Sequence, residues 1–370
     1  MNSAARVLFV PVSGPSGMGE FARARSLADA LRARWPQVET RFLLHRDAPY
    51  AQDFHHPVTL IPASPTLCTD EVVRTIEAFK PGVVVFDNAG RTKALKAARR
   101  VGARVVYVSS RGRQRYKAFR SHWMRQLDDH WISYPAIIAG ALGFFERLKL
   151  RLLGRPQVRY LDAVLAPADE RAADASLAQF GSPDLLVVPG GGSQFHDASI
   201  TPSDFARWSK VVAAQGFRVV FIAGPAFSGS AEDMPGVRLV RGVSGGALHA
   251  LLARAKVVFV NGGDTLLQAL AVGKACVAVP IAGDQAARIA RCAALGAVIA
   301  PTAMASSGTE PAEACLELLR DEGLRSALET RVRAAGFEDA LPALIERLGA
   351  HLGLSTLDPA ARDLASMSSR

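Results

Sequence analysis

The chain has 370 residues, with 44 Lys and Arg against 34 Asp and Glu, so its formal net charge is +10. Apolar residues make up 49% of it, which excludes a wholly disordered protein and is enough for two domains with ordinary cores. The four cysteines are too few and too scattered for a disulfide framework, and they lack the paired spacing of a zinc site. We therefore expect a reducing, cytoplasmic setting, and no signal peptide.

The excess positive charge lies in one segment. Residues 1–180 hold 27 Lys and Arg against 16 Asp and Glu, whereas residues 181–370 hold 17 against 18. Within the first half, residues 99–159 alone hold 14 basic and 3 acidic residues. A sequence pI near 9.8 indicates a polyanionic partner, which is a nucleic acid, an anionic membrane surface or a phosphorylated substrate.

Short apolar runs rich in Val, Ile and Phe alternate with helix-like stretches along the whole chain. Such continuous runs are typical of parallel strands buried on both faces, so we expect an α/β protein with two Rossmann-like sheets of about six strands each. The expected strands are Val7–Val12, Arg41–Leu44, Val58–Ile61, Val83–Phe86, Val105–Val108, Ala163–Leu165, Leu185–Val188, Val219–Ile222, Val237–Val240, Val257–Val260, Cys276–Val279 and Val298–Ala300.

The runs divide the chain into two domains. We expect an N-terminal domain over residues 1–168 and a C-terminal domain over 184–353, joined by a polar, Ala-rich linker around 167–183. Residues 354–370 are small and polar and are expected to form a tail.

The strongest chemical signal is the block from Val257 to Gln285. A strand ends in Asn261-Gly262-Gly263, and a helix begins around Asp264-Thr265. Glycines let the backbone approach a ligand, and the free N–H groups of a first helical turn favour an anion, which predicts a diphosphate site. A second strand runs into Gly190-Gly191-Gly192-Ser193, which is either a second anion loop or only a tight turn.

These motifs resemble the C-terminal, donor-binding domain of GT-B glycosyltransferases. The resemblance covers residues 184–302 and is strongest to the family-28 type, which includes the enzyme that adds N-acetylglucosamine to lipid I. The matching motifs of this chain are Gly191-Gly192-Ser193, Gly262-Gly263-Asp264-Thr265, Gly273-Lys274 and Asp284-Gln285. The resemblance implies a GT-B fold, in which two Rossmann-like domains face each other across a cleft.

The resemblance also implies residue roles in binding a nucleotide-sugar donor. Ser193 and the amides of Gly263–Thr265 would hold the diphosphate, Asp284 and Gln285 would contact the transferred sugar, and Val243 would line the base pocket. Gln268 stands where the family has a glutamate that accepts both ribose hydroxyls, which leaves UDP, CMP, GDP and dTDP open, with a UDP-sugar expected first. Asp264 is a second departure, and we expect it to cap the helix with its side chain turned away.

The loop after the first strand, Ser13 to Glu20, resembles the family's N-terminal glycine loop and that of a nucleotide-sugar hydrolase. Its glycines Gly17 and Gly19 precede Glu20, which falls where those proteins have a histidine. Glu20 is our first candidate for the base that takes a proton from the acceptor, with favourable placement at a helix start as the alternative. Asp87 is the second candidate, with a plain turn residue as its alternative.

The sequence predicts no metal site. No D-x-D motif follows a strand, and Asp128-Asp129-His130 are consecutive, so we interpret them as a solvated helix face. This agrees with the metal-independent transfer that the resemblance to GT-B enzymes implies, and we expect the transfer to be inverting.

The basic segment, residues 111–156, surrounds an uncharged stretch from Trp131 to Phe145. This stretch is too short to span a bilayer, but apolar residues flanked by cations suit the surface of an anionic membrane. The alternative is a core helix with a basic end; no nucleic-acid-binding motif accompanies it, so we expect no nucleic acid. The residues expected at the membrane are Arg113, Arg115, Trp131, Phe144, Phe145 and Lys149.

Together these features predict a glycosyltransferase on the inner face of the cytoplasmic membrane. It would move a sugar from a nucleotide-sugar co-substrate, with no other cofactor, to a lipid-linked or cell-envelope glycan acceptor. A nucleotide-sugar hydrolase of the same architecture and a degenerate nucleotide-sugar-binding protein remain alternatives.

Overall fold

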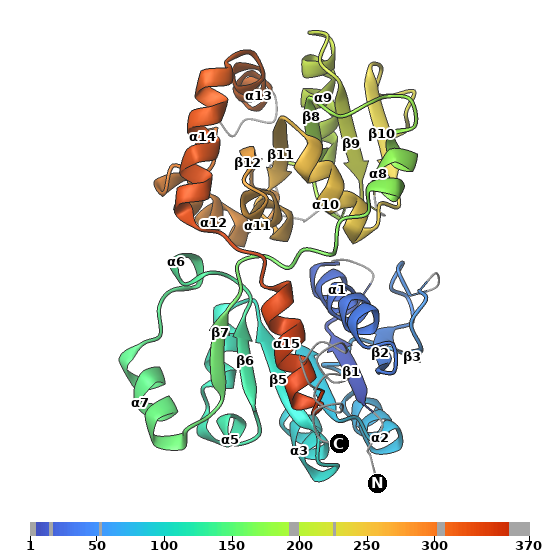
Figure 1. Ribbon diagram of the computed structural model, residues 1–370, viewed down its shortest axis with the longest axis vertical. Coiled ribbons are helices and arrows are strands. Elements are labelled where there is room, and N and C mark those ends of the chain that lie inside the picture. The colour runs from blue at the N-terminus through green and yellow to red at the C-terminus, as the bar shows by residue number, and fades with distance from the viewer. Residues whose placement is uncertain are drawn as a thin grey trace, which may run out of the picture.

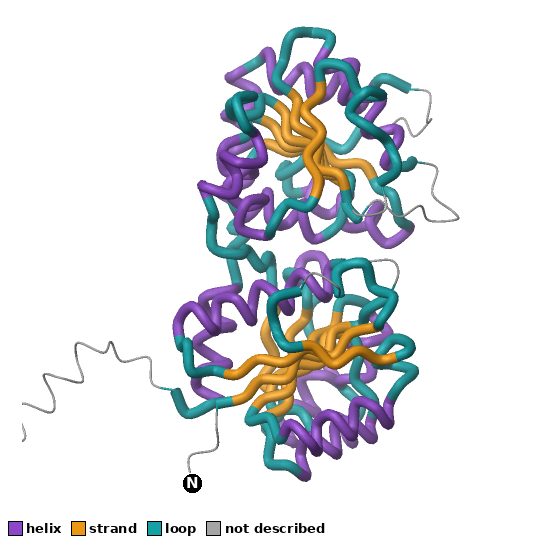
Figure 2. Tube along the Cα trace, turned by 90° about the vertical axis from the view of Figure 1, so that its right-hand side faces the viewer, coloured by secondary structure: helices purple, strands orange, loops and turns teal. Residues whose placement is uncertain are grey.

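The computed structural model describes residues 5–14, 18–51, 54–191, 200–224, 227–301 and 308–354. Two lobes, each built around a parallel β-sheet, lie one above the other (Figure 1). Figure 2 shows helices on both faces of each sheet, as the long apolar strand sequences require.

The first lobe holds seven parallel strands in the order β3-β2-β1-β4-β5-β6-β7. Its central strand β4 is buried at every position, because helices cover both faces of the sheet. The strands are β1 (Arg6–Pro11), β2 (Glu39–His45), β3 (Val58–Ile61), β4 (Val83–Asp87), β5 (Arg104–Ser109), β6 (Asp129–Ile132) and β7 (Gln157–Tyr160).

Two apolar cores flank this sheet. Helices α1 and α15 contribute to the core on one face, and α2 and α3 to the core on the other. The helices of this lobe are α1 (Gly19–Arg34), α2 (Thr69–Phe79), α3 (Thr92–Arg100), α4 (Gly112–Ala118), α5 (Ser121–Met124), α6 (Ala136–Ala139), α7 (Phe144–Leu153) and α15 (Leu341–His351).

The second lobe holds five parallel strands in the order β10-β9-β8-β11-β12 around one large core. Its strands are β8 (Leu185–Val188), β9 (Val219–Ala223), β10 (Val237–Arg241), β11 (Val257–Asn261) and β12 (Ala275–Val279). Its helices are α8 (Glu170–Leu177), α9 (Pro202–Ala213), α10 (Gly245–Arg254), α11 (Asp264–Ala271), α12 (Gly283–Ala294), α13 (Glu310–Arg320) and α14 (Glu322–Ala335).

Ten of the twelve predicted strands are present, and two are not. Residues 163–165 and 298–300 form isolated bridges instead, through Ala163 to Asp339 and Ile299 to Val277. The sequence analysis missed β6 and β7, whose polar residues hide the apolar pattern of a buried strand.

The interpretation of Asp128-Asp129-His130 as a solvated helix face is wrong. Asp129 and His130 begin β6, and all three side chains are buried. Asp128 accepts hydrogen bonds from Arg99, Arg104 and Arg155, so three of the 14 basic residues of the stretch 99–159 are paired with one carboxylate. A buried carboxylate needs such partners, because burial of an unpaired charge is costly.

After α14, the last helix of the second lobe, the chain returns to the first lobe. Helix α15 packs on α1, and its Arg347 and His351 bond the buried Asp129 of β6. The last helix of the predicted C-terminal domain, 184–353, therefore belongs to the first lobe. Helix α8 lies in the predicted linker but packs on α10 in the second lobe.

Candidate functional site

In each sheet, the strand order reverses at one point, and ligands of such folds bind outside the carboxyl ends of the strands there. In the first lobe this point lies between β1 and β4, and in the second between β8 and β11. The loop before Glu20 follows β1 and Asp87 ends β4, while the Gly190 loop follows β8 and the Asn261-Gly262-Gly263 turn ends β11. The predicted chemical residues therefore sit at the two switch points.

Glu20 lies in the first turn of α1 and is partly exposed. Asn88 Nδ2 donates to Glu20 Oε1 at 3.0 Å, and Asn88 itself has a left-handed backbone with φ 56°. The backbone N–H of Ser110 donates to Asn88 Oδ1 at 3.0 Å, which fixes the orientation of that amide. Within the described part of the chain the second oxygen of Glu20 has no hydrogen-bond partner, so it is open to a ligand.

Asp87, the second candidate base, is buried and fully engaged. Arg23 donates to both of its oxygens, through Nε at 2.8 Å and Nη2 at 3.3 Å. Burial raises the pKa of Asp87 to about 7, although the Arg23 guanidinium acts in the opposite direction. Because Arg23 occupies both oxygens of Asp87, this structure favours Glu20 over Asp87 as the candidate base.

Arg23 joins the two lobes. Its Nη1 donates to Asp264 Oδ2 of the second lobe at 3.0 Å, and its Nη2 also donates to Ser110 Oγ at 3.3 Å. Burial alone would lower the pKa of Arg23, but Asp87 and Asp264 raise it above its usual value, so this arginine is charged. The sequence analysis did not single out Arg23, and its acidic partners lie 64 and 241 residues away.

Asp264 is not the cap of α11 that the sequence predicted. The cap is Gly263, and Asp264 is the first helical residue. Its carboxylate turns toward the first lobe, where Arg23 and the Tyr134 hydroxyl donate to it. The backbone N–H groups of Asp264 and Thr265 have no hydrogen-bond acceptor among the described residues, so they remain available to an anion.

Close packing explains the glycines at the second switch point. A Cβ at Gly190, where φ is +97°, or at Gly263 would collide with the side chain of Asn261. Asn261 links the two loops, because its Nδ2 donates to Pro189 O and its Oδ1 accepts from Gly263 N, both at 2.7 Å. Gly191 follows Gly190 in this loop, whereas Gly192, Ser193 and Gly17 lie outside the described residues.

The remaining predicted donor residues have mixed surroundings. Gln268 Nε2 donates to Val164 O of the interlobe connection at 2.9 Å, and its oxygen has no partner among the described residues. Gln285 is buried, and its Oε1 accepts from Ile281 N, so only its nitrogen lacks a partner within the described part of the chain. Asp284 lines a cavity between the lobes, and Val243 packs at the edge of the second core.

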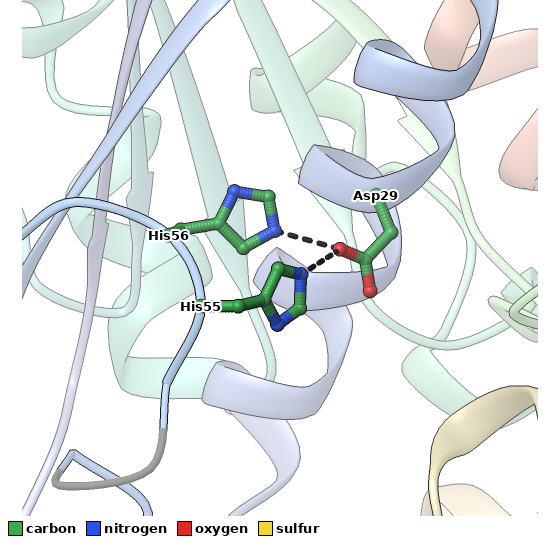
Figure 3. Close-up of side chains that lie close together, drawn as sticks. All are labelled: Asp29, His55 and His56. Atoms are coloured by element: carbon green, nitrogen blue, oxygen red, sulfur yellow. Dashed lines mark hydrogen bonds and ion pairs between the residues drawn. The ribbon is translucent and has the colours of Figure 1, made fainter.

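One group of described residues has donor atoms close enough together to hold a metal ion: Asp29, His55 and His56 (Figure 3). Both histidines place Nε2 against Asp29 Oδ1, at 2.9 Å for His55 and 2.6 Å for His56. Thr40 Oγ1 lies 2.9 Å from the second nitrogen of His56. These hydrogen bonds account for the cluster, which fastens the segment before β3 onto α1.

Two of the six predicted membrane residues are misplaced. Trp131 is 1% exposed in the core of the first lobe. Arg115 is largely buried and holds the α6–α7 connection, bonding Glu146 and the carbonyls of residues 139, 140 and 141. Of the other four, Arg113 is exposed, while Lys149 is partly buried and donates to Phe119 O.

Helix α7 does present an apolar face to solvent. Phe144, Phe145, Leu148 and Leu152 are 67%, 72%, 41% and 74% exposed, and their spacing places them on one side of the helix. We call these four residues the α7 face. No helix in the described part of the chain is both long and apolar enough to cross a bilayer.

No protein-family model matches the sequence, and no curated protein matches it significantly. Solved structures do match over most of the chain. SnogD from Streptomyces nogalater, a glycosyltransferase, has a TM-score of 0.62 at 19% identity, covering 94% of this chain and 100% of that one. The glycosyltransferase VinC, in complex with dTDP, has a TM-score of 0.58 at 16% identity, with 94% and 99% coverage. UGT2 of Phytolacca americana, complexed with UDP-2fluoro-glucose and pterostilbene, has a TM-score of 0.60 at 12% identity, with 94% and 99% coverage.

These likenesses confirm the predicted fold, a GT-B architecture of two parallel-sheet lobes. At such low identity they establish the fold alone. The narrower resemblance to the family-28 type stays a prediction.

Proposed function

We propose that the protein is a glycosyltransferase, with its donor site in the second lobe and its acceptor site in the first. One observation carries the proposal: the first turn of α1 lies against the first turn of α11. A Cβ on Gly19 would lie 3.4 Å from Asp264 Oδ2, so the carboxylate of Glu20 and the free amides of α11 belong to one region. Similar proteins with this fold, such as VinC and the Phytolacca UGT2, have been solved with dTDP and a UDP-sugar analogue.

The donor diphosphate would lie at the start of α11. The amides of Asp264 and Thr265 and the Thr265 hydroxyl can donate to it, and the positive end of the helix dipole favours its charge. Arg23 holds the carboxylate of Asp264 and offsets its repulsion of a phosphate. We expect a UDP-sugar first, bound without a metal ion because amides meet the charge of the leaving group.

In the reaction, the acceptor oxygen forms a bond to the anomeric carbon while the bond from that carbon to the diphosphate oxygen breaks. The electron pair of the broken bond leaves with the nucleoside diphosphate. The acceptor proton goes to Glu20, whose second oxygen has no hydrogen-bond partner among the described residues. Attack opposite the leaving group inverts the anomeric configuration. Asn88 holds the other oxygen of Glu20 and so fixes the base in place.

Calorimetric titration with UDP-, dTDP-, GDP- and CMP-sugars tests the donor site. We expect one nucleotide class to bind, and the Thr265→Val variant to bind it more weakly. A matched control is Thr330→Val on the exposed part of α14, for which we expect no change. If no nucleotide sugar binds, the proposal fails and a degenerate scaffold is favoured; fast release of nucleotide without any acceptor favours a hydrolase.

We also propose that the acceptor is lipid-linked or part of an envelope glycan, and that the α7 face rests on an anionic membrane. The cations Arg147 and Arg151 belong to α7 and Arg113 to α4; all three are exposed and suit anionic headgroups. Sedimentation with phosphatidylglycerol vesicles tests this contact. We expect Phe145→Asp with Leu152→Asp to abolish binding, and the equally exposed Leu67→Asp to leave it unchanged. Binding that survives the double substitution would exclude the contact.

A further inference from the structure

A cavity of about 330 Å³ lies between the lobes beside the Glu20 region. Its first-lobe wall is the end of β5, the start of α4 and the segment through α6, and its second-lobe wall is α12. Ser110 connects it to the proposed base, because Asn88 Nδ2 donates to both Ser110 Oγ and Glu20 Oε1. A molecule in the cavity is therefore separated from Glu20 by one shared amide.

The walls of this cavity are strongly basic. Four arginines line it, with Asp284 as the only acidic residue among the described lining residues. Two of the four are already occupied within the protein. Arg115 bonds Glu146 and three carbonyls, and Arg288 bonds Gly262 O and Asp284.

Arg111 and Arg291 are different. Neither has a hydrogen-bond or ion-pair partner among the residues that the structure describes, and both are exposed. Arg111 comes from the first lobe and Arg291 from the second, yet they line the same cavity. Two like charges that converge on one space repel each other, and an anion placed there would remove that repulsion.

One arginine in the wall of the cavity, Arg288, has a fixed orientation. The Arg288 guanidinium lies 4.0 Å from the centre of the Tyr134 ring, and Tyr134 in turn donates to Asp264. Together with the Ser110 hydroxyl, the unpaired guanidiniums of Arg111 and Arg291 offer forked donors that suit the oxygens of phosphate or carboxylate, and the occupied Arg288 adds its positive charge.

We propose that this cavity binds an oxyanion of the acceptor, a phosphate or a carboxylate, and so selects acidic acceptors. The identification of the bound molecule as the acceptor rests on the proposed function, but the existence of the anion site does not. The donor diphosphate has its own amides at α11, whereas this cavity takes most of its wall from the first lobe. An acceptor anchored here by its anion would present a neighbouring hydroxyl to Glu20.

The test uses the full chain and compares charge removal inside the cavity with charge removal outside it. The cavity variant is Arg111→Gln with Arg291→Gln. The matched control is Arg32→Gln with Arg171→Gln, which removes two exposed arginines, one from each lobe, that do not line the cavity. The probes are inorganic phosphate, octyl phosphate and the neutral octyl glucoside, titrated at constant ionic strength. The nucleotide identified by the donor panel is present at saturation, so that the α11 site is filled.

We expect phosphate affinity to fall by about tenfold or more in the cavity variant, to stay unchanged in the control, and nucleotide affinity to stay unchanged in both. Tighter binding of octyl phosphate than of phosphate identifies a lipid-linked source, and equal binding a free anion. Phosphate affinity that is the same in both variants overturns the cavity site. An equal fall in nucleotide affinity overturns the acceptor assignment and gives these arginines to the donor.

Failure of the proposed function gives a different result. If no nucleotide binds the wild-type chain, the transferase proposal fails, and the phosphate titration without nucleotide still decides the anion site. If a nucleotide binds and phosphate does not, only the cavity proposal fails.

Discussion

The arginines near the contact between the lobes form two groups, one buried and paired with carboxylates and the other exposed and unpaired within the described structure. Arg23 is 7% exposed and bonds two carboxylates, one from each lobe, while Arg111 and Arg291 are exposed and have no partner among the described residues. A buried cation must be paired, because an unpaired charge away from water is costly. The paired arginine therefore serves as a joint between the lobes, and the unpaired ones are left for a ligand.

Removal of the joint has the largest expected effect. Arg23→Met leaves Asp87 buried without its cation, which we expect to cost about 3–5 kcal/mol in the free energy of unfolding, measured by urea denaturation. Adding Asp87→Leu should recover part of this loss, because no unpaired charge then remains. Arg25→Met, on the same helix but at a half-exposed ion pair, should cost less than about 1 kcal/mol. A similarly small loss for Arg23→Met would contradict its role as a joint.

His130 is a third case, a basic group that is buried with no acidic partner among the described residues. Burial and the nearby Arg115 lower its pKa to about 3, so it is neutral in the folded protein. Its unfolded pKa is about 6.5, so the unfolded chain binds the extra proton and stability falls as the pH drops below that value.

When the pH is lowered from 7.5 to 5.5, we expect protonation of His130 in the unfolded chain to lower the free energy of unfolding by about 1 kcal/mol. His130→Leu should lose that part of the pH dependence, whatever its stability at pH 7.5. Urea denaturation of both proteins at the two pH values measures the difference. Identical pH dependence of the two proteins would mean that the pKa of His130 is the same in the folded and the unfolded chain.

The unpaired arginines should have the smallest effect on stability. Arg111→Gln and Arg291→Gln remove no hydrogen bond or ion pair within the described structure, so we expect each to change the free energy of unfolding by less than about 0.5 kcal/mol. A larger loss in thermal unfolding would show that these side chains serve the fold, and the contrast with Arg23 would disappear.

Much of the fold was predictable, because strands buried on both faces are continuous apolar runs. The predicted runs at Val83–Phe86 and Val257–Val260 are central strands with every residue buried. Strands β6 and β7 were missed for the converse reason. The charges of β6 are satisfied by distant residues, as when Arg347, 218 residues away, bonds Asp129, and no local pattern reports such a partner.

In the candidate site, too, local features were predictable from the sequence and features that depend on distant residues were not. The glycines around Asn261 were predictable from local sequence, because tight turns and close approach restrict a single short segment. The joint at Arg23 was not, because it exists only when β4 and α11 are brought to the same helix. A long polar residue beside the apolar face of α1 was the available signal. The unpaired state of Arg111 and Arg291 likewise depends on the contact between the lobes.

The central claim is that Glu20 takes the proton of the acceptor at the contact between the lobes. The most direct test compares single-turnover transfer by the wild type, by Glu20→Gln and by the matched surface variant Glu322→Gln, whose side chain is 85% exposed. With the identified donor and an acidic acceptor, we expect Glu20→Gln to slow transfer by about 100-fold or more with donor affinity unchanged, and Glu322→Gln to behave as the wild type. Transfer by Glu20→Gln within a few-fold of the wild-type rate would contradict the claim.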